Sequence, residues 1–220
     1  MTDQTAPRTI PLSLFAFSVF YGGMICTAGI LANKQVSLGP LAVESGIFPF
    51  LMLVIIASAV TELWGAKTAQ KLVYFGFVPL IIASLLTYFV LVLPAAEEMQ
   101  ADRLDAFNLL LASTPRIWLA GIAAYGTSTL LNVWIFDKMK QPGGKLLWLR
   151  SAVAGVLSQT VDSLIFITIA FLGVFPILPL LAGQMLAKAV LSFIAIPPLV
   201  ALAVKLARKI DAPKDAAPAN

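Results

Sequence analysis

The chain alternates long apolar segments with short polar ones over almost its whole length. A helix needs about 20 mainly apolar residues to cross about 30 Å of hydrocarbon. Six segments meet this requirement, at residues 11–32, 42–61, 72–93, 116–136, 151–174 and 177–204. Each should be helical, because lipid offers no hydrogen-bond partner to a free backbone group. The pattern therefore predicts an all-α membrane protein, a bundle of six transmembrane helices.

The polar segments divide the chain into one transmembrane domain, 11–206, and two ends. Residues 1–10 are expected to form a cytoplasmic N-terminus, and residues 207–220 a disordered cytoplasmic tail. Residues 95–114 make the one sizeable loop, and residues 173–179 a tight Pro-rich hairpin. The first apolar run is long for a signal peptide, so we interpret it as the first span.

Basic residues indicate the orientation, since cytoplasmic loops of membrane proteins carry an excess of Lys and Arg. With the N-terminus inside, the outer side keeps only Lys34, Arg103 and Arg116. The inner side collects Arg8, Lys67, Lys71, Lys138, Lys140, Lys145, Arg150, Lys205, Arg208, Lys209 and Lys214. Both termini are therefore predicted to be cytoplasmic.

Composition supports a membrane protein and narrows the chemistry. Hydrophobic residues make up 60% and charged residues 12% of the chain, against about 45–50% and about 25% in soluble domains. The net charge of +4 fits loop bias better than nucleic-acid binding. The sequence has no histidine, one cysteine (Cys26) and no phosphate-binding Gly-rich motif. We expect no enzyme activity, no cofactor, no metal and no nucleic-acid partner.

Polar residues within the spans fall at helical spacing, so each helix presents one polar stripe. The stripes are Ser58 and Glu62; Tyr125, Ser128 and Asn132; Ser151, Gly155, Ser158, Gln159 and Asp162; and Gln184, Lys188 and Ser192. Stripes that face inward would build a polar cavity. Small and hydroxyl residues on such stripes also serve simply to pack helices together.

Asp162 lies near the middle of the fifth span, where a charge is costly to insert. An ion pair with Lys188 would explain it structurally, and a substrate or proton site functionally. Glu62, at the end of its span, is either solvated or functional. Pro49 and the Pro197-Pro198 pair should interrupt the second and sixth spans, and interrupted helices are frequent near transporter binding sites.

Several motifs resemble the queuosine precursor transporter family, also described as vitamin-uptake-like transporters. The segment from Ser158 to Phe166 and on to Gly173 is similar to that family's S-Q-x-x-D-[ST]-x-x-F…I-A-F segment. Thr61-Glu62-Leu63-Trp64-Gly65 resembles its T-E-x-[YW]-G element, and 32–34 and 132–140 resemble its elements at the ends of the first and fourth spans. Ser58 departs from the Asp usual in that family. The resemblance covers about residues 12–206.

The resemblance implies import of queuosine precursors, 7-cyano- or 7-aminomethyl-7-deazaguanine, across the inner membrane. A carboxylate can accept both donors of a guanine-like edge, so Asp162 is the central candidate. The full set of candidate binding residues is Asp162, Gln159, Lys188, Gln184, Asn33, Glu62, Asn132 and Phe48. Phe50, Tyr21 and Phe166 are further candidates for stacking on the ring.

Two further interpretations remain open from the residues alone. In the first, the chain is the substrate-capture subunit of a multisubunit importer for another small heterocycle, with separate ATPase partners. A homo-oligomer is also compatible with the sequence. The small-molecule substrate and the lipid bilayer are the partners that every interpretation shares.

Overall fold

The computed structural model describes residues 10–31, 34–39, 41–111, 115–140, 146–173 and 177–212. Apart from one two-stranded hairpin, the described elements are helices. They are α1 (Leu12–Leu31), β1 (Gln35–Leu38), β2 (Leu41–Glu44), α2 (Ile47–Trp64), α3 (Ala66–Val92), α4 (Ala101–Leu111), α5 (Pro115–Lys138), α6 (Leu147–Phe171), α7 (Leu178–Ile194) and α8 (Ile196–Asp211).

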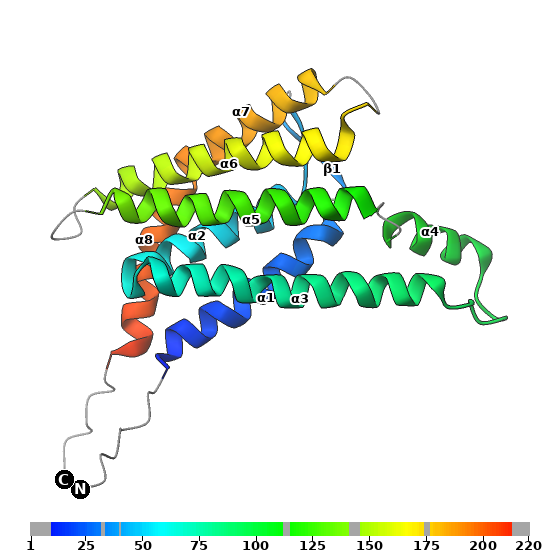
Figure 1. Cartoon of the computed structure of the whole chain (residues 1–220), viewed down its shortest axis with the longest axis horizontal. Coiled ribbons are helices and arrows are strands. Elements are labelled where there is room, and N and C mark those ends of the chain that lie inside the picture. Colours follow the sequence, from blue (N-terminus) through cyan, green and yellow to red (C-terminus); the bar gives the residue numbers. More distant parts are fainter. Residues whose placement is uncertain are drawn as a thin grey trace, which may run out of the picture.

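Five described helices, α1, α2, α3, α5 and α6, are long and apolar enough to cross a membrane. The pair α7 and α8 qualifies as a sixth span, bent by 44° at its break. The prediction of an all-α bundle of membrane-spanning helices is confirmed. In Figure 1, α7, α6, α5 and α3 lie side by side, with α1, α2 and α8 packed against them.

Helix α2 is the centre of the bundle. Ala57, Ala59 and Val60 are fully buried, and α2 contributes to both apolar clusters of the core. One cluster joins α2 to α5, α6, α7 and α8, and the other joins it to α1, α3 and α5. The outer face of α3 exposes large apolar residues such as Phe75 and Leu85, as expected of a surface that faces lipid.

The sixth span breaks where the sequence places its proline pair. Pro197 and Pro198 supply no backbone N–H and collide with the preceding helical turn, and α7 ends at Ile194 before α8 begins at Ile196. The break brings Ile196 against α6 at Gly155, where a Cβ atom would lie 2.7 Å from Ile196 Cδ1. Gly155 therefore permits the close approach of the two helices.

Pro49 does not interrupt the second span, contrary to the prediction from the sequence. It lies in the first turn of α2, where the N–H groups have no intrahelical partner and proline is tolerated. The expected helical start at residue 42 is also wrong. Residues 41–44 form strand β2, which pairs antiparallel with β1, Val36 opposite Val43.

The hairpin marks one end of the bundle, which we call the hairpin end. Val43 is buried in the core cluster that includes Ala187 of α7. Ser45 Oγ donates to the carbonyl oxygens of Leu31 and Lys34, at 2.5 and 2.8 Å. These contacts hold the link between α1 and α2 against the bundle.

The polar stretch 95–114 is not simply a loop, because it contains α4. None of the described residues of α4 is buried, which fits its mixture of charged and apolar residues in the sequence. Likewise, α8 continues to Asp211, five residues into the segment that we expected to be a tail. Asp211 accepts hydrogen bonds from the backbone N–H of Ser13, at 3.0 Å, and from its hydroxyl.

Candidate functional site

A small recess, with free space of about 10 Å³ or about one water molecule, lies where the first turn of α2 meets α6 and α7. It is lined by Gly46, Ile47, Phe50, Asp162, Phe166, Gln184 and Lys188. Drug-sized ligands occupy sites of about 300–1,000 Å³, so the recess would have to widen to admit one. Asp162 is nine residues from the end of α6 at Phe171, a depth of about 14 Å at 1.5 Å per residue.

A buried ion pair forms the polar wall of the recess. Lys188 Nζ donates to Asp162 Oδ2 at 2.6 Å, and Ser128 Oγ donates to Asp162 Oδ1 at 3.0 Å. The side chains of Lys188 and Asp162 are 7% and 4% exposed. Each carboxylate oxygen offers two acceptor positions, so each keeps one position without a donor among the described residues.

The remaining walls add an amide and aromatic rings. Gln184 is buried one helical turn before Lys188 on α7. Lys188 Nζ lies 5.6 Å from the centre of the Phe50 ring, and Phe166 lines the recess from α6. The recess therefore combines a carboxylate, a cation, an amide and aromatic faces, the groups that recognise a planar polar heterocycle.

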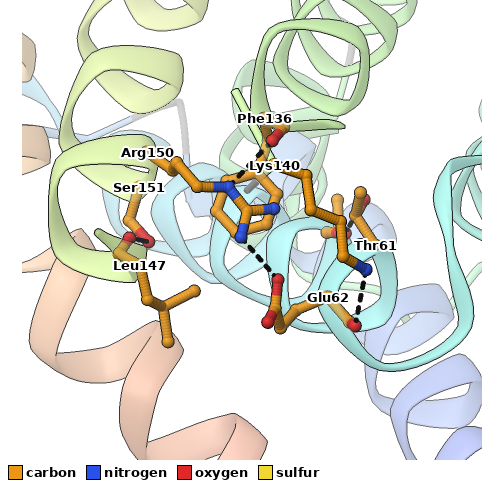
Figure 2. Close-up of polar contacts among 8 residues, drawn as sticks. Thr61, Glu62, Phe136, Lys140, Leu147, Arg150 and Ser151 are labelled. Atoms are coloured by element: carbon orange, nitrogen blue, oxygen red, sulfur yellow. Dashed lines mark hydrogen bonds and ion pairs between the residues drawn. The ribbon is translucent and has the colours of Figure 1, made fainter. Parts of the chain in front are cut away.

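A second buried charge cluster lies at the opposite end of the bundle, which we call the Glu62 end (Figure 2). Arg150 Nη1 donates to Glu62 Oε2 at 2.7 Å, and Arg150 Nε donates to the carbonyl oxygen of Phe136 at 3.1 Å. The guanidinium lies 4.1 Å from the centre of the Phe136 ring. Lys140 Nζ donates to the Glu62 carbonyl oxygen at 3.3 Å. The cluster ties the ends of α2, α5 and α6 together.

Residues 44–202 match the family described as "Putative vitamin uptake transporter". The chain belongs to this family. The matched range holds the whole recess and the Glu62 end, whereas Asn33 lies outside it.

Two relatives carry a narrower description. A "Probable queuosine precursor transporter" of Bacillus subtilis (strain 168) is 28% identical over 186 residues, which cover 81% of this chain and 80% of the relative. Another protein of that name, from Haemophilus influenzae, is 29% identical over 125 residues, 56% of this chain and 49% of the relative. No solved structure gives a significant match.

Family membership settles the class of activity. The protein is a multi-pass membrane transporter of a small molecule and not an enzyme. The predicted membership in the vitamin-uptake-like transporter family is confirmed, and the names of the two relatives agree with the narrower resemblance to queuosine precursor transporters.

The structure brings three of the eight candidate residues to the recess, Asp162, Gln184 and Lys188. Two others lie deeper in the bundle. Gln159 is buried, and its Oε1 has no partner among the described residues. Asn132 is fully buried, and its Oδ1 accepts a hydrogen bond from Ser58 Oγ at 3.1 Å.

The other three candidates lie elsewhere. Phe48 is 42% exposed and does not line the recess; Phe50, two residues on, does. Glu62 follows Ile47 by 15 residues on α2, so it is about 22 Å along the helix from the recess. Asn33 lies outside the described residues.

Sequence reasoning overlooked Arg150. It counted this arginine among the cytoplasmic basic residues, but the side chain is fully buried at the start of α6. The sequence did offer a sign that Arg150 is buried, because Arg150 directly follows Leu147-Trp148-Leu149 and precedes a long apolar run. For Ser128 the sequence left both a packing role and a place in a polar cavity open, and the structure shows that it donates to Asp162.

Proposed function

We propose that this transporter imports queuosine precursors, 7-cyano-7-deazaguanine, 7-aminomethyl-7-deazaguanine or both, across the inner membrane. The observation that carries the proposal is the similarity to the Bacillus subtilis relative over 81% of the chain. The groups that line the recess suit the same ligand class. The distribution of basic residues supports cytoplasmic N- and C-termini.

In the proposed binding mode, Asp162 receives the N–H and NH₂ donors of the ligand's guanine-like edge. The two open acceptor positions of its carboxylate suit these two donors. Gln184 or Lys188 then donates to the ring carbonyl oxygen, and Phe50 or Phe166 stacks on the ring face. Gln159, one turn before Asp162 on α6, is proposed to contact a second edge of the ligand through its amide oxygen, which has no partner among the described residues.

The test uses a bacterial host that neither makes nor imports the precursor. The host expresses this chain and receives a low external concentration of each deazaguanine, and the queuosine content of its transfer RNA is measured. Restored queuosine with the chain, and none with an empty vector, is the expected result. No restoration while the protein is present in the membrane contradicts the proposal for a transporter that works alone.

The substrate-capture subunit stays the second candidate, because the family as a whole is described by vitamin uptake. Calorimetric titration of the purified protein with each deazaguanine separates the two. Tight binding without uptake in the host favours a capture subunit that needs an ATPase partner. Absence of both binding and uptake indicates a different heterocycle.

A further inference from the structure

A line of buried polar side chains runs through the bundle from the recess towards the Glu62 end. We call it the seam, and it consists of Ser128, Asn132, Ser58 and Ser158. Ser128 bonds to Asp162 at the recess. One turn further along α5, Asn132 Oδ1 accepts from Ser58 Oγ at 3.1 Å and Asn132 Nδ2 donates to Ser158 Oγ at 3.5 Å.

The seam continues to the buried charges by one more helical turn. Ser58 and Glu62 are four residues apart on α2 and so lie on one face of that helix. The seam therefore lies on three helices between the Asp162–Lys188 ion pair and the Glu62–Arg150 ion pair. Ser and Asn also join membrane helices by hydrogen bonds, so it is the position of the seam between two buried ion pairs that points to a route.

The Glu62–Arg150 pair closes the end of the seam. Arg150 is fully buried and the Glu62 side chain is 9% exposed. Arg150 Nη2 has no partner among the described residues. Entry of water at this end would satisfy that donor and hydrate both charges. Opening of this end therefore removes the free-energy cost of burying them.

The backbone beside Glu62 provides a bend at the same end. Gly65 separates α2 from α3 with φ 83° and ψ 164°, a conformation that is essentially restricted to glycine. The contact between Glu62 and Arg150 is the ion pair that holds the end of α2 against α6 among the described residues. Release of this pair would remove the ion pair that holds the end of α2 against α6, next to the bend at Gly65.

We propose that Glu62 and Arg150 form the cytoplasm-side gate of the transport route, and that the seam is the closed inner half of that route. The proposal rests on the transport activity of the family and not on which ligand is carried. Ser158, fully buried in the described structure, then becomes accessible to water from the cytoplasm when the gate opens.

The first experiment measures that accessibility with a cysteine reporter. Cys26 is the single cysteine of the chain, so Cys26→Ala gives a thiol-free background in which Ser158→Cys is introduced. A membrane-impermeant maleimide is applied to inside-out and right-side-out vesicles. Glu62→Gln should raise the labelling rate in inside-out vesicles at least about tenfold, because the open population grows as the closed state is weakened.

Two controls match this experiment. Leu157→Cys is a reporter at the neighbouring position, 48% exposed on the lipid side of α6, and its labelling should not change. Lys138→Gln removes an exposed charge at the same end of α5 and should leave Ser158→Cys protected. Unchanged labelling of Ser158→Cys in inserted Glu62→Gln protein overturns the proposal. Faster labelling only from the outer face also overturns it.

A second experiment leaves both gate residues in place. Leu63 and Leu147 lie on α2 and α6 and pack against the same apolar cluster, and each is replaced by cysteine in the Cys26→Ala background. In proteoliposomes, a thiol-cleavable bifunctional reagent that joins them should stop uptake of radiolabelled 7-aminomethyl-7-deazaguanine, and reduction should restore it. The two single-cysteine proteins should be unaffected. Uptake that continues after complete cross-linking overturns the gate.

The two experiments separate this proposal from that of the substrate. Labelling of Ser158→Cys uses no ligand, so its result stands whatever the protein carries. A wrong substrate shows as no uptake before cross-linking, whereas a wrong gate shows as uptake that survives cross-linking.

Discussion

Lys188 Nζ lies 2.6 Å from Asp162 Oδ2, and the pair is enclosed between α6 and α7. Each charge makes the burial of the other tolerable, because an isolated ion in a low-dielectric interior is strongly destabilising. The pair also lines the recess. The structural and functional explanations of Asp162 that the sequence left open are therefore compatible with each other.

Replacement of Asp162 by Asn should reduce uptake at least about tenfold, since a hydrogen bond to a charged group contributes about 1.5–3 kcal/mol. Queuosine in transfer RNA of the deficient host reports uptake, and immunoblotting of membranes reports insertion. Asp105→Asn, in the exposed helix α4, serves as the control and should behave as the parent. Normal uptake by Asp162→Asn would show that the Asp162 carboxylate does not bind the substrate.

Paired neutralisation separates stability from transport. Asp162→Asn alone leaves Lys188 buried without its partner and should lower the free energy of unfolding by about 3–5 kcal/mol. Asp162→Asn combined with Lys188→Met removes both charges and should recover most of this loss. Denaturant unfolding of detergent-purified protein measures the stability, and the host assay measures uptake. Recovered stability without recovered uptake is expected; recovery of both would make the ion pair purely structural.

Gly76 provides a test of packing between α3 and the centre of the bundle. A Cβ atom there would lie 2.8 Å from Tyr21 Cε1 and 3.1 Å from Tyr125 Oη, and these two tyrosines are hydrogen-bonded to each other at 2.5 Å. Gly76→Ala should therefore destabilise the protein by about 1–3 kcal/mol, the usual cost of overpacking. Gly23→Ala, with nothing within 4 Å of the added atom, should be neutral or slightly stabilising.

The contact between Asp211 and Ser13 places a carboxylate at the start of α1, where helix N–H groups lack intrahelical partners. This is the chemistry of an N-cap, supplied here by a residue 198 positions away. Asp211→Ala should lower the free energy of unfolding by about 0.5–2 kcal/mol. Lys209→Ala, exposed on the same helix, is the matched control, and an equal loss in both would exclude a capping role for Asp211.

The helical spacing of polar residues in the sequence predicted much of the candidate site. Asp162, Gln184 and Lys188 were selected because a charge or amide inside a span costs free energy unless it has a partner or a function, and all three line the recess. The sequence placed Phe48 among the eight candidate binding residues and Phe50 only among the further stacking candidates. In the structure Phe50 lines the recess and Phe48 does not. Residues two positions apart on a helix point in nearly opposite directions, and which of the two faces the recess depends on where α2 begins.

The length of the apolar segments and the cost of free backbone groups in lipid determined that this chain is a bundle of membrane-spanning helices. The proline pair likewise determined the break between α7 and α8, because steric exclusion by proline is local. Only the tertiary structure decided that Arg150 turns inward to Glu62 and Phe136 and that Asp211 reaches Ser13. The physical reason is the same in each case: the partner lies far away in sequence, so the free energy of the contact depends on how the helices pack and not on spacing along one of them.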